Sequence, residues 1–177
     1  MQNVALLRGI NVARRTMPMS ELTACLSGVG LGEVTTVLQT GNVIFSSDSA
    51  LRSLKLTIEA GLTERFNYPA HVLVYRMERL RRIVESTPFD ADDSMMHSYV
   101  VFFEDGLELK LMAEARDLDH KVEAIGLGDS VLYWRVLKGS TLQSGFARYL
   151  TKARYKDFHT NRNIKTLRKI VASRAAT

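Results

Sequence analysis

The chain has 177 residues, of which 46% are hydrophobic and 24% charged, the composition of an ordinary globular protein with enough apolar residues for a core. No apolar run approaches the roughly 20 residues of a membrane span, and a single cysteine, Cys25, excludes an internal disulfide framework. The net charge of +5 is uneven, because residues 138–177 hold ten Lys and Arg against one acidic residue. We therefore expect a cytoplasmic protein with no membrane partner and a basic C-terminal segment.

The first 76 residues show the pattern of one α+β unit. The predicted elements are, in chain order, a strand over 4–8, a helix over 19–29, strands over 34–40 and 42–46, a helix over 51–66 and a strand over 70–75. The pair Gly41-Asn42 favours a hairpin turn between the second and third strands. The resulting order, β-α-β-β-α-β, is ferredoxin-like.

The rest of the chain nearly repeats this pattern. It predicts a helix over 77–86, a strand over 98–104, a helix over 107–118, strands over 121–127 and 130–137, a helix carrying Leu142, Phe146, Tyr149 and Leu150, and a final helix over about 161–173. We predict an α+β fold of two ferredoxin-like units packed together, the second without a clear last strand and with an extra basic C-terminal helix. The predicted domains are 1–86, a connector over 87–97, and 98–177.

The order of elements also predicts which loops lie together. If the first strand and the second run in the same direction, the loop that leaves the first strand lies beside the hairpin that follows the second. Residues 8–11 and 40–42 should therefore share one edge of the first unit. By the same argument, Glu104-Asp105, Gly128-Asp129 and residues 151–160 should lie together at one end of the second unit.

Three short strings carry a family resemblance: residues 5–12, residues 38–45, and residues 160–166, which include Asn161-Arg162-Asn163. On these strings the chain resembles the uncharacterised bacterial family catalogued as domain of unknown function 1697. The resemblance extends over the whole chain, and it implies two ferredoxin-like units and no established activity. The family usually has Gly, Ser and an aromatic residue where this chain has Ala13, Thr40 and Ile164.

Arg162 is the first candidate binding residue. We expect it in the first turn of the last helix, where the positive end of the helix dipole makes a cation unfavourable by about 0.3–1 kcal/mol. A bound anion would compensate for this cost, with Thr160 or Asn161 capping the helix. An ion pair with Asp105 or Asp129 is the equal alternative.

The first strand ends in a second candidate, Arg8, whose guanidinium suits two-point binding of phosphate or carboxylate. Gly9 allows a sharp turn or a close approach to a ligand, and Asn11 either bonds a ligand or closes the loop as an Asx turn. The predicted ligand-binding residues are Arg8, Gly9, Asn11, Thr40, Asn42, Arg162 and Asn163.

Several familiar chemistries have no matching pattern. Residues 28–32 contain three glycines but follow a predicted helix, so they indicate a helix end rather than a dinucleotide-binding loop. The four histidines have no paired spacing on a helix, and we expect neither a metal nor a cofactor.

The leading hypothesis is a cytoplasmic binding protein whose site combines Arg8, Asn11 and Arg162 and takes nucleic acid or a phosphorylated small molecule. The basic tail suits such a partner through its long-range field, although a solvated helix with scattered lysines is an equal reading. One alternative is a cofactor-free enzyme acting on a phosphorylated or carboxylate substrate, with His159 or a carboxylate as acid or base. Another alternative is that the three motifs have a purely structural role and hold the two units together.

Overall fold

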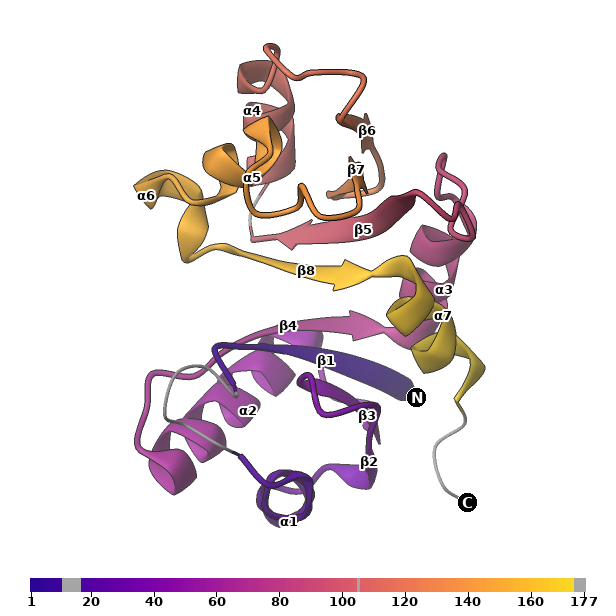
Figure 1. Ribbon diagram of the computed structural model, residues 1–177. Coiled ribbons are helices and arrows are strands. Elements are labelled where there is room, and N and C mark those ends of the chain that lie inside the picture. The colour runs from indigo at the N-terminus through magenta and orange to yellow at the C-terminus, as the bar shows by residue number, and fades with distance from the viewer. Residues whose placement is uncertain (11–16, 105, 174–177) are drawn as a thin grey trace. The chain divides into compact units, whose positions relative to one another are not determined.

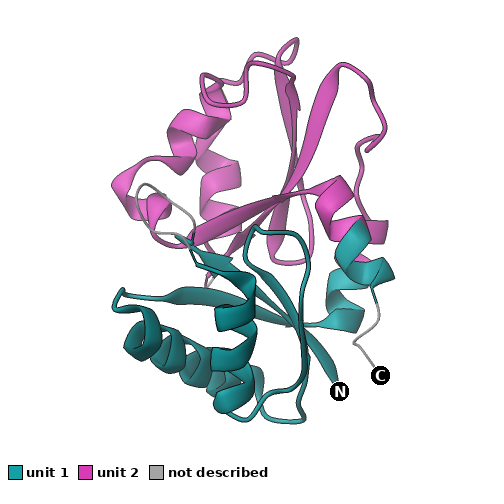
Figure 2. Ribbon diagram, turned by 60° about the horizontal axis from the view of Figure 1, so that its bottom comes forward, with its two compact units in different colours: residues 1–81, 169–177 teal, residues 82–168 magenta. Residues whose placement is uncertain are grey.

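The computed structural model describes residues 1–10, 17–104 and 106–173. These residues form eight strands and seven helices, with the strands arranged in two four-stranded sheets (Figure 1). The chain divides into two compact units, which Figure 2 colours separately: unit 1 is residues 1–81 with 169–177, and unit 2 is residues 82–168. The mixed α+β class is therefore confirmed, and each unit holds one of the two sheets.

Unit 1 is built on an antiparallel sheet in the order β2-β3-β1-β4. Its elements are β1 (Gln2–Arg8), α1 (Met19–Gly28), β2 (Gly32–Thr36), β3 (Asn42–Ser46), α2 (Leu51–Phe66) and β4 (His71–Arg76), after which α3 (Met77–Glu85) leads into unit 2. Helices α1 and α2 cover one face of the sheet (Figure 1), and the core between them includes Leu22, Leu26, Ile58 and Leu62.

Unit 2 repeats this arrangement with the strand order β6-β7-β5-β8. Its elements are β5 (Met96–Phe103), α4 (Leu107–Glu114), β6 (Glu123–Leu127), β7 (Val131–Leu137), α5 (Gly145–Leu150), α6 (Ala153–Lys156), β8 (His159–Asn163) and α7 (Ile164–Ala172), of which the last four residues belong to unit 1. Helices α4 and α5 pack on the core that surrounds Trp134.

The prediction that the second unit lacks a last strand was wrong. Strand β8 pairs antiparallel with β5, from Tyr99 opposite Asn163 to Phe103 opposite His159. Its sequence, His-Thr-Asn-Arg-Asn, has no apolar alternation, because β8 is an edge strand that is held by its pairing with β5 more than by its own burial. The last helix therefore begins at Ile164 and not near residue 161.

The connection between β2 and β3 is longer than the predicted two-residue hairpin. Strand β2 ends at Thr36, and the backbone N–H of Val37 donates to the carbonyl of Asn42 at 2.9 Å. The five residues 37–41 then reverse the chain, with Leu38 and Gly41 both at positive φ. The hairpin itself is present, but its turn precedes Asn42 instead of including it.

The two helices of unit 1 approach each other closely at Gly61. A Cβ at this position would lie 2.7 Å from Cγ1 of Val29, which is closer than real Cβ atoms come. The thiol of Cys25 donates to the Gly61 carbonyl at 3.4 Å, and burial raises the pKa of that thiol. Cys25 is thus a packing residue of unit 1, as its helical position predicts.

The core of unit 2 contains a buried carboxylate. The side chain of Glu123 is 1% exposed and accepts hydrogen bonds from the Trp134 indole at 3.1 Å and from the Phe146 backbone N–H at 3.0 Å. These bonds tie β6 to β7 and to the start of α5. Helix α5 begins only at Gly145, so Leu142, which we expected on its buried stripe, precedes the helix and is 91% exposed.

Candidate functional site

The loop that leaves β1 lies beside the connection between β2 and β3, as the element order predicts. The Leu7 backbone N–H donates to the Gly41 carbonyl at 2.8 Å. Gly41 has a φ of +74°, and a Cβ there would lie 2.7 Å from Cδ1 of Ile10. Glycine is required at this position for both reasons, its backbone conformation and the close approach of Ile10.

Asn42 pins this connection from within. Its side chain is fully buried, and its amide donates to the Val37 carbonyl at 3.1 Å and to the Thr40 hydroxyl at 2.8 Å. Because the two amide hydrogens each have an acceptor in the loop, these contacts favour a structural role for Asn42. A role of Thr40 or Asn42 in ligand binding stays a prediction.

Arg8 ends β1 opposite His71, the first residue of β4, and is partly exposed. Gly9 follows with a φ of +64°, and a Cβ there would meet no atom within 4 Å, so its conformation rather than crowding accounts for the glycine. The third predicted residue of this loop, Asn11, lies outside the described residues, as do Arg14 and Arg15. Arg8 and Gly9 are thus placed at the edge of unit 1 where the sequence predicts them.

The surroundings of Arg162 differ from the prediction. Arg162 lies in β8 and not in the first turn of a helix, so the helix dipole is not what makes its position unusual. The cap of α7 is Asn163, whose side-chain carbonyl accepts from the Lys165 backbone N–H at 2.9 Å. The expectation that Thr160 or Asn161 caps this helix was therefore wrong.

Arg162 is held in place by its own strand. Its guanidinium donates to the Thr160 hydroxyl at 2.7 Å and to the Asn161 carbonyl at 2.8 Å. The side chain is only partly exposed, and this burial lowers the pKa of Arg162 to about 10. The guanidinium stays charged at neutral pH, because a pKa of about 10 lies well above 7.

The strand register places Arg162 in a row that crosses unit 2. Val100 of β5 lies opposite Arg162 on one side and opposite Tyr133 of β7 on the other. Directly opposed residues of antiparallel strands project from the same face, and this is the face opposite Val101 and Trp134, which belong to the helix-covered core. Tyr133 lies in the same row as Arg162, on the other side of Val100, and sequence reasoning missed the row because only the register reveals it.

At least three of the ten cations of the C-terminal segment are paired with carboxylates. Arg154 bonds Glu114 at 3.0 Å, and Asp92 accepts from Arg168 at 3.0 Å and lies 3.6 Å from Lys165. The hydrogen bond from Arg168 is the main cause that lowers the pKa of Asp92. These exposed pairs contribute little stability, but they reduce the net field that the segment presents to an anionic partner.

His159, the candidate acid or base of the enzyme alternative, starts β8. Its Nδ1 lies 2.8 Å from the Tyr155 carbonyl, which can only accept, so Nδ1 carries the proton in this bond. Its ring stands 6.1 Å from that of Phe103. These contacts fix the orientation of the imidazole against unit 2.

The described ranges contain neither a cluster of metal ligands nor a membrane-spanning helix. No three His, Cys, Asp or Glu side chains there converge as a metal site requires. No helix among the same residues has the length and apolar character needed to cross a membrane.

The predicted binding residues fall in both units. Arg8, Gly9, Thr40 and Asn42 belong to unit 1, and Arg162 and Asn163 belong to unit 2. Within unit 1 the structure brings Gly41 and the end of β1 together, and within unit 2 it brings Thr160 to Arg162. A common site formed by Arg8, Asn11 and Arg162 stays a prediction.

Comparison with known proteins gives the chain a family and a fold. Among solved structures, the conserved bacterial protein SP0830 from Streptococcus pneumoniae is 24% identical, with 97% of this chain and 96% of that chain covered and a TM-score of 0.81, so the two share a fold. No curated protein matches the chain. The model of the family described as "Protein of unknown function (DUF1697)" matches residues 1–133, and the chain belongs to this family.

Proposed function

We propose that the protein binds an anionic ligand and that Arg162 is the principal cation of the site. The observation that carries the proposal is a partly buried guanidinium on an edge strand, with Thr160 and Asn161 fixing its direction. An arginine placed in this way is already ordered and partly desolvated in the folded protein. Two-point binding of phosphate or carboxylate therefore costs less further entropy and desolvation. The start of α7 follows immediately, and its backbone N–H groups add positive potential beside Arg162.

The ligand we propose is a phosphorylated small molecule. A nucleic acid would draw on many exposed cations at once, but Arg154, Lys165 and Arg168 already have carboxylate partners. A single guanidinium flanked by a hydroxyl suits one phosphate group. Nucleic acid is kept as an outcome of the test.

Two finer statements accompany this proposal. The element order β-α-β-β-α-β and the matching strand orders of the two sheets support the description of both units as ferredoxin-like.

The thiol of Cys25, which forms no disulfide, suits a protein that works in the cytoplasm.

The test compares wild type with Arg162→Gln, Arg162→Lys and the control Arg168→Gln, which removes an exposed cation already paired with Asp92. Inorganic pyrophosphate is titrated by calorimetry, and a labelled mixed-sequence single-stranded oligonucleotide is titrated by anisotropy at two salt concentrations. We expect pyrophosphate binding to fall at least about tenfold in Arg162→Gln, to survive in part in Arg162→Lys, and to be unchanged in the control.

The other outcomes separate the alternatives. Oligonucleotide binding that falls steeply with salt and is weakened by Arg162→Gln would replace the small molecule by nucleic acid. Binding of neither probe to wild type would overturn anion binding at this strand. A lowered melting temperature in Arg162→Gln with unchanged binding would make Arg162 a structural pin.

A further inference from the structure

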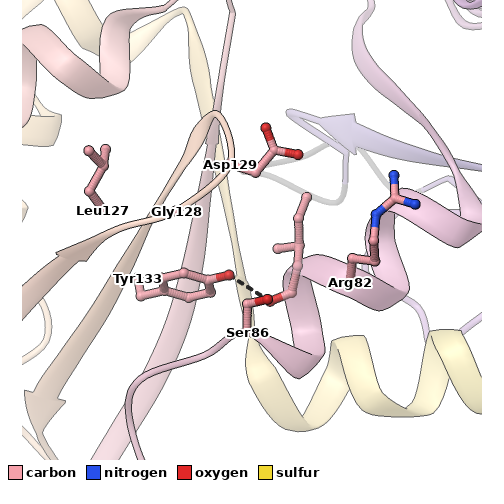
Figure 3. A pocket seen from close by; sticks show the side chains of 7 residues that line it. Arg82, Ser86, Leu127, Gly128, Asp129 and Tyr133 are labelled. Atoms are coloured by element: carbon pink, nitrogen blue, oxygen red, sulfur yellow. Dashed lines mark hydrogen bonds between the residues drawn. The ribbon is translucent and has the colours of Figure 1, made fainter.

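We propose that a pocket of unit 2, separate from the Arg162 site, binds a small neutral molecule that has a flat apolar body and one N–H group, such as indole. The pocket has a volume of about 250 Å³ and lies between the end of α3 and the turn that joins β6 to β7 (Figure 3). Its walls include Ile83 of α3 and Ser86 just after this helix, Leu127 and Gly128 at the turn, and Tyr133 of β7.

The turn is shaped so that the Tyr133 ring lies against it. The Gly128 backbone N–H donates to the Val131 carbonyl at 2.9 Å, and Ser130 has a φ of +57°. A Cβ on Gly128 would lie 2.5 Å from Cε2 of Tyr133, so a larger residue would displace the ring. Glycine at this position is therefore part of how the pocket wall is built.

Tyr133 also ties the turn to α3. Its hydroxyl donates to the Ile83 carbonyl at 2.7 Å, the contact drawn as a dashed line in Figure 3. Tyr133 is buried, and this burial, together with the nearby Asp129 carboxylate, raises the pKa of its hydroxyl. The hydroxyl thus stays protonated at neutral pH and keeps the two sides of the pocket at a fixed separation.

The charged side chains of the pocket wall are already engaged. Arg82 and Asp129 also line the pocket, and each of them has an interaction within the protein. A charged ligand would have to compete for these groups, and it would give up its own hydration on entering the pocket. A neutral ligand leaves the existing interactions in place and loses little hydration. The wall therefore favours a neutral molecule.

One polar side chain of the wall is open to a ligand. Ser86 is exposed, and its hydroxyl has no hydrogen-bond partner among the residues that the structure describes. The oxygen of a serine hydroxyl accepts a hydrogen bond from an N–H group. A neutral ligand with one N–H group therefore gains a hydrogen bond at Ser86 without displacing any contact of the folded chain.

The apolar walls and the volume define the body of the ligand. Ile83, Leu127 and the Tyr133 ring give the pocket an apolar surface, and Leu127 is 50% exposed, so a ligand that covers it removes apolar surface from water. An apolar cavity of about 150 Å³ holds benzene, and a pocket of about 250 Å³ has room for two fused rings. A flat ring also gains from packing against the Tyr133 ring. Indole combines this size and shape with one N–H group.

The test is an NMR titration of the full ¹⁵N-labelled chain with indole, benzofuran, tryptamine and indole-3-acetate. Benzofuran has the shape of indole with an oxygen atom in place of the N–H group, and the other two compounds add an ammonium or a carboxylate. We expect indole to shift the amide signals of Ser86 and Gly128 with a dissociation constant of about 1 mM. Benzofuran should bind at least about threefold more weakly, and neither charged compound should bind more tightly than indole.

Variants at two exposed positions assign the contacts. Ser86→Ala should weaken indole binding at least about threefold and leave benzofuran binding unchanged, while the matched control Ser94→Ala, an exposed serine outside the pocket wall, should change neither. Leu127→Ala should weaken the binding of both compounds, and Leu109→Ala, at an exposed leucine of α4, should not.

Three results would overturn the proposal. The first is the absence of any shift at about 10 mM indole. The second is tighter binding of tryptamine or indole-3-acetate than of indole, which would show that a charge of the pocket wall is open to a ligand. The third is an equal effect of each variant and its control, which would place the binding of indole elsewhere on the chain.

Discussion

The two units share their strand order, and apart from α6 their elements follow in the same order, but they differ in the row of the sheet that contains Arg162. In unit 2 the row runs Tyr133–Val100–Arg162, and the row at the corresponding register of unit 1 runs Ile44–Val4–Tyr75. The unit 1 row is apolar or aromatic throughout, so this architecture does not need a cation there. The fold requires a strand at this edge of the sheet, and the cation on that strand is a feature of unit 2 alone.

The units also differ in the polar group that pins each sheet. Unit 1 uses the neutral amide of Asn42, the first residue of β3, and unit 2 uses the carboxylate of Glu123 within its core. A buried carboxylate with two donors is costly to disrupt, because truncation leaves both donors unsatisfied. Unit 2 should therefore be the more sensitive of the two to loss of its pin.

The largest effect is expected from removing the buried carboxylate of Glu123. Glu123→Ala should lower the free energy of unfolding by about 3–5 kcal/mol, since it leaves the Trp134 indole and the Phe146 N–H without an acceptor and opens a cavity. Urea denaturation followed by Trp134 fluorescence measures the loss. The matched control is Glu108→Ala, because Glu108 is also buried but one of its carboxylate oxygens has no hydrogen-bond partner. An equal loss in both variants would show that burial alone, and not the two bonds, sets the cost.

A middle-sized effect concerns α6, the helix that unit 2 has between α5 and β8 and that has no counterpart between α2 and β4 of unit 1. Burial and the nearby Glu114 carboxylate raise the pKa of Tyr155 in this helix to about 12. The unfolded chain therefore releases this proton near the ordinary tyrosine pKa of about 10, while the folded chain keeps it. Stability should then fall by up to about 2 kcal/mol as the pH rises from about 10 to 12.

The measurement for Tyr155 is urea unfolding at a series of pH values for wild type and Tyr155→Phe. The variant should lack this part of the loss and should be as stable as wild type at neutral pH, because the hydroxyl it removes makes no direct hydrogen bond. Parallel pH curves for the two proteins would contradict the assignment to Tyr155.

The smallest effect is expected from a substitution that makes the row of unit 2 more like the row of unit 1. Arg162→Tyr gives unit 2 the residue that unit 1 has at the corresponding position, Tyr75. We expect its free energy of unfolding to stay within about 1 kcal/mol of wild type, because the loss of the hydrogen bonds to Thr160 and Asn161 is offset by relief of the desolvated charge. Thermal melting checks this, and a loss above about 2 kcal/mol would show that the cation is part of the fold.

The sequence predicted the elements that have strong apolar patterns. Residues 42–46 and 51–66 match β3 and α2, because the first is a short run of buried, mostly apolar residues and the second buries Leu54, Ile58 and Leu62 at the spacing of a helix. Strand β8 has no such period, and its existence depends on β5, which lies more than fifty residues earlier in the chain. Pairing with a distant partner overrides local preference, which single-sequence patterns do not record.

The sequence predicts only part of the candidate site, because the surroundings of Arg162 also depend on pairing between distant strands. Arg162 was identified as unusual, but the expected cause, a cation at a helix start, depended on a helix that begins two residues later. The hydrogen bond that Arg162 donates to Thr160 and the position of Arg162 opposite Val100 follow from strand β8 and its register. The charge of a residue is visible in the sequence, whereas its desolvation and its neighbours are properties of the paired sheet.

The division of the chain has a consequence for its synthesis. Unit 1 consists of residues 1–81 and of residues that follow 168, while unit 2 is one continuous stretch between them. A ribosome adds these parts in order, so unit 2 has all its residues before unit 1 does, although most of unit 1 emerges first. An arrested chain that stops at residue 168 would carry every residue of unit 2, and it would carry the whole sheet of unit 1 without the end of α7.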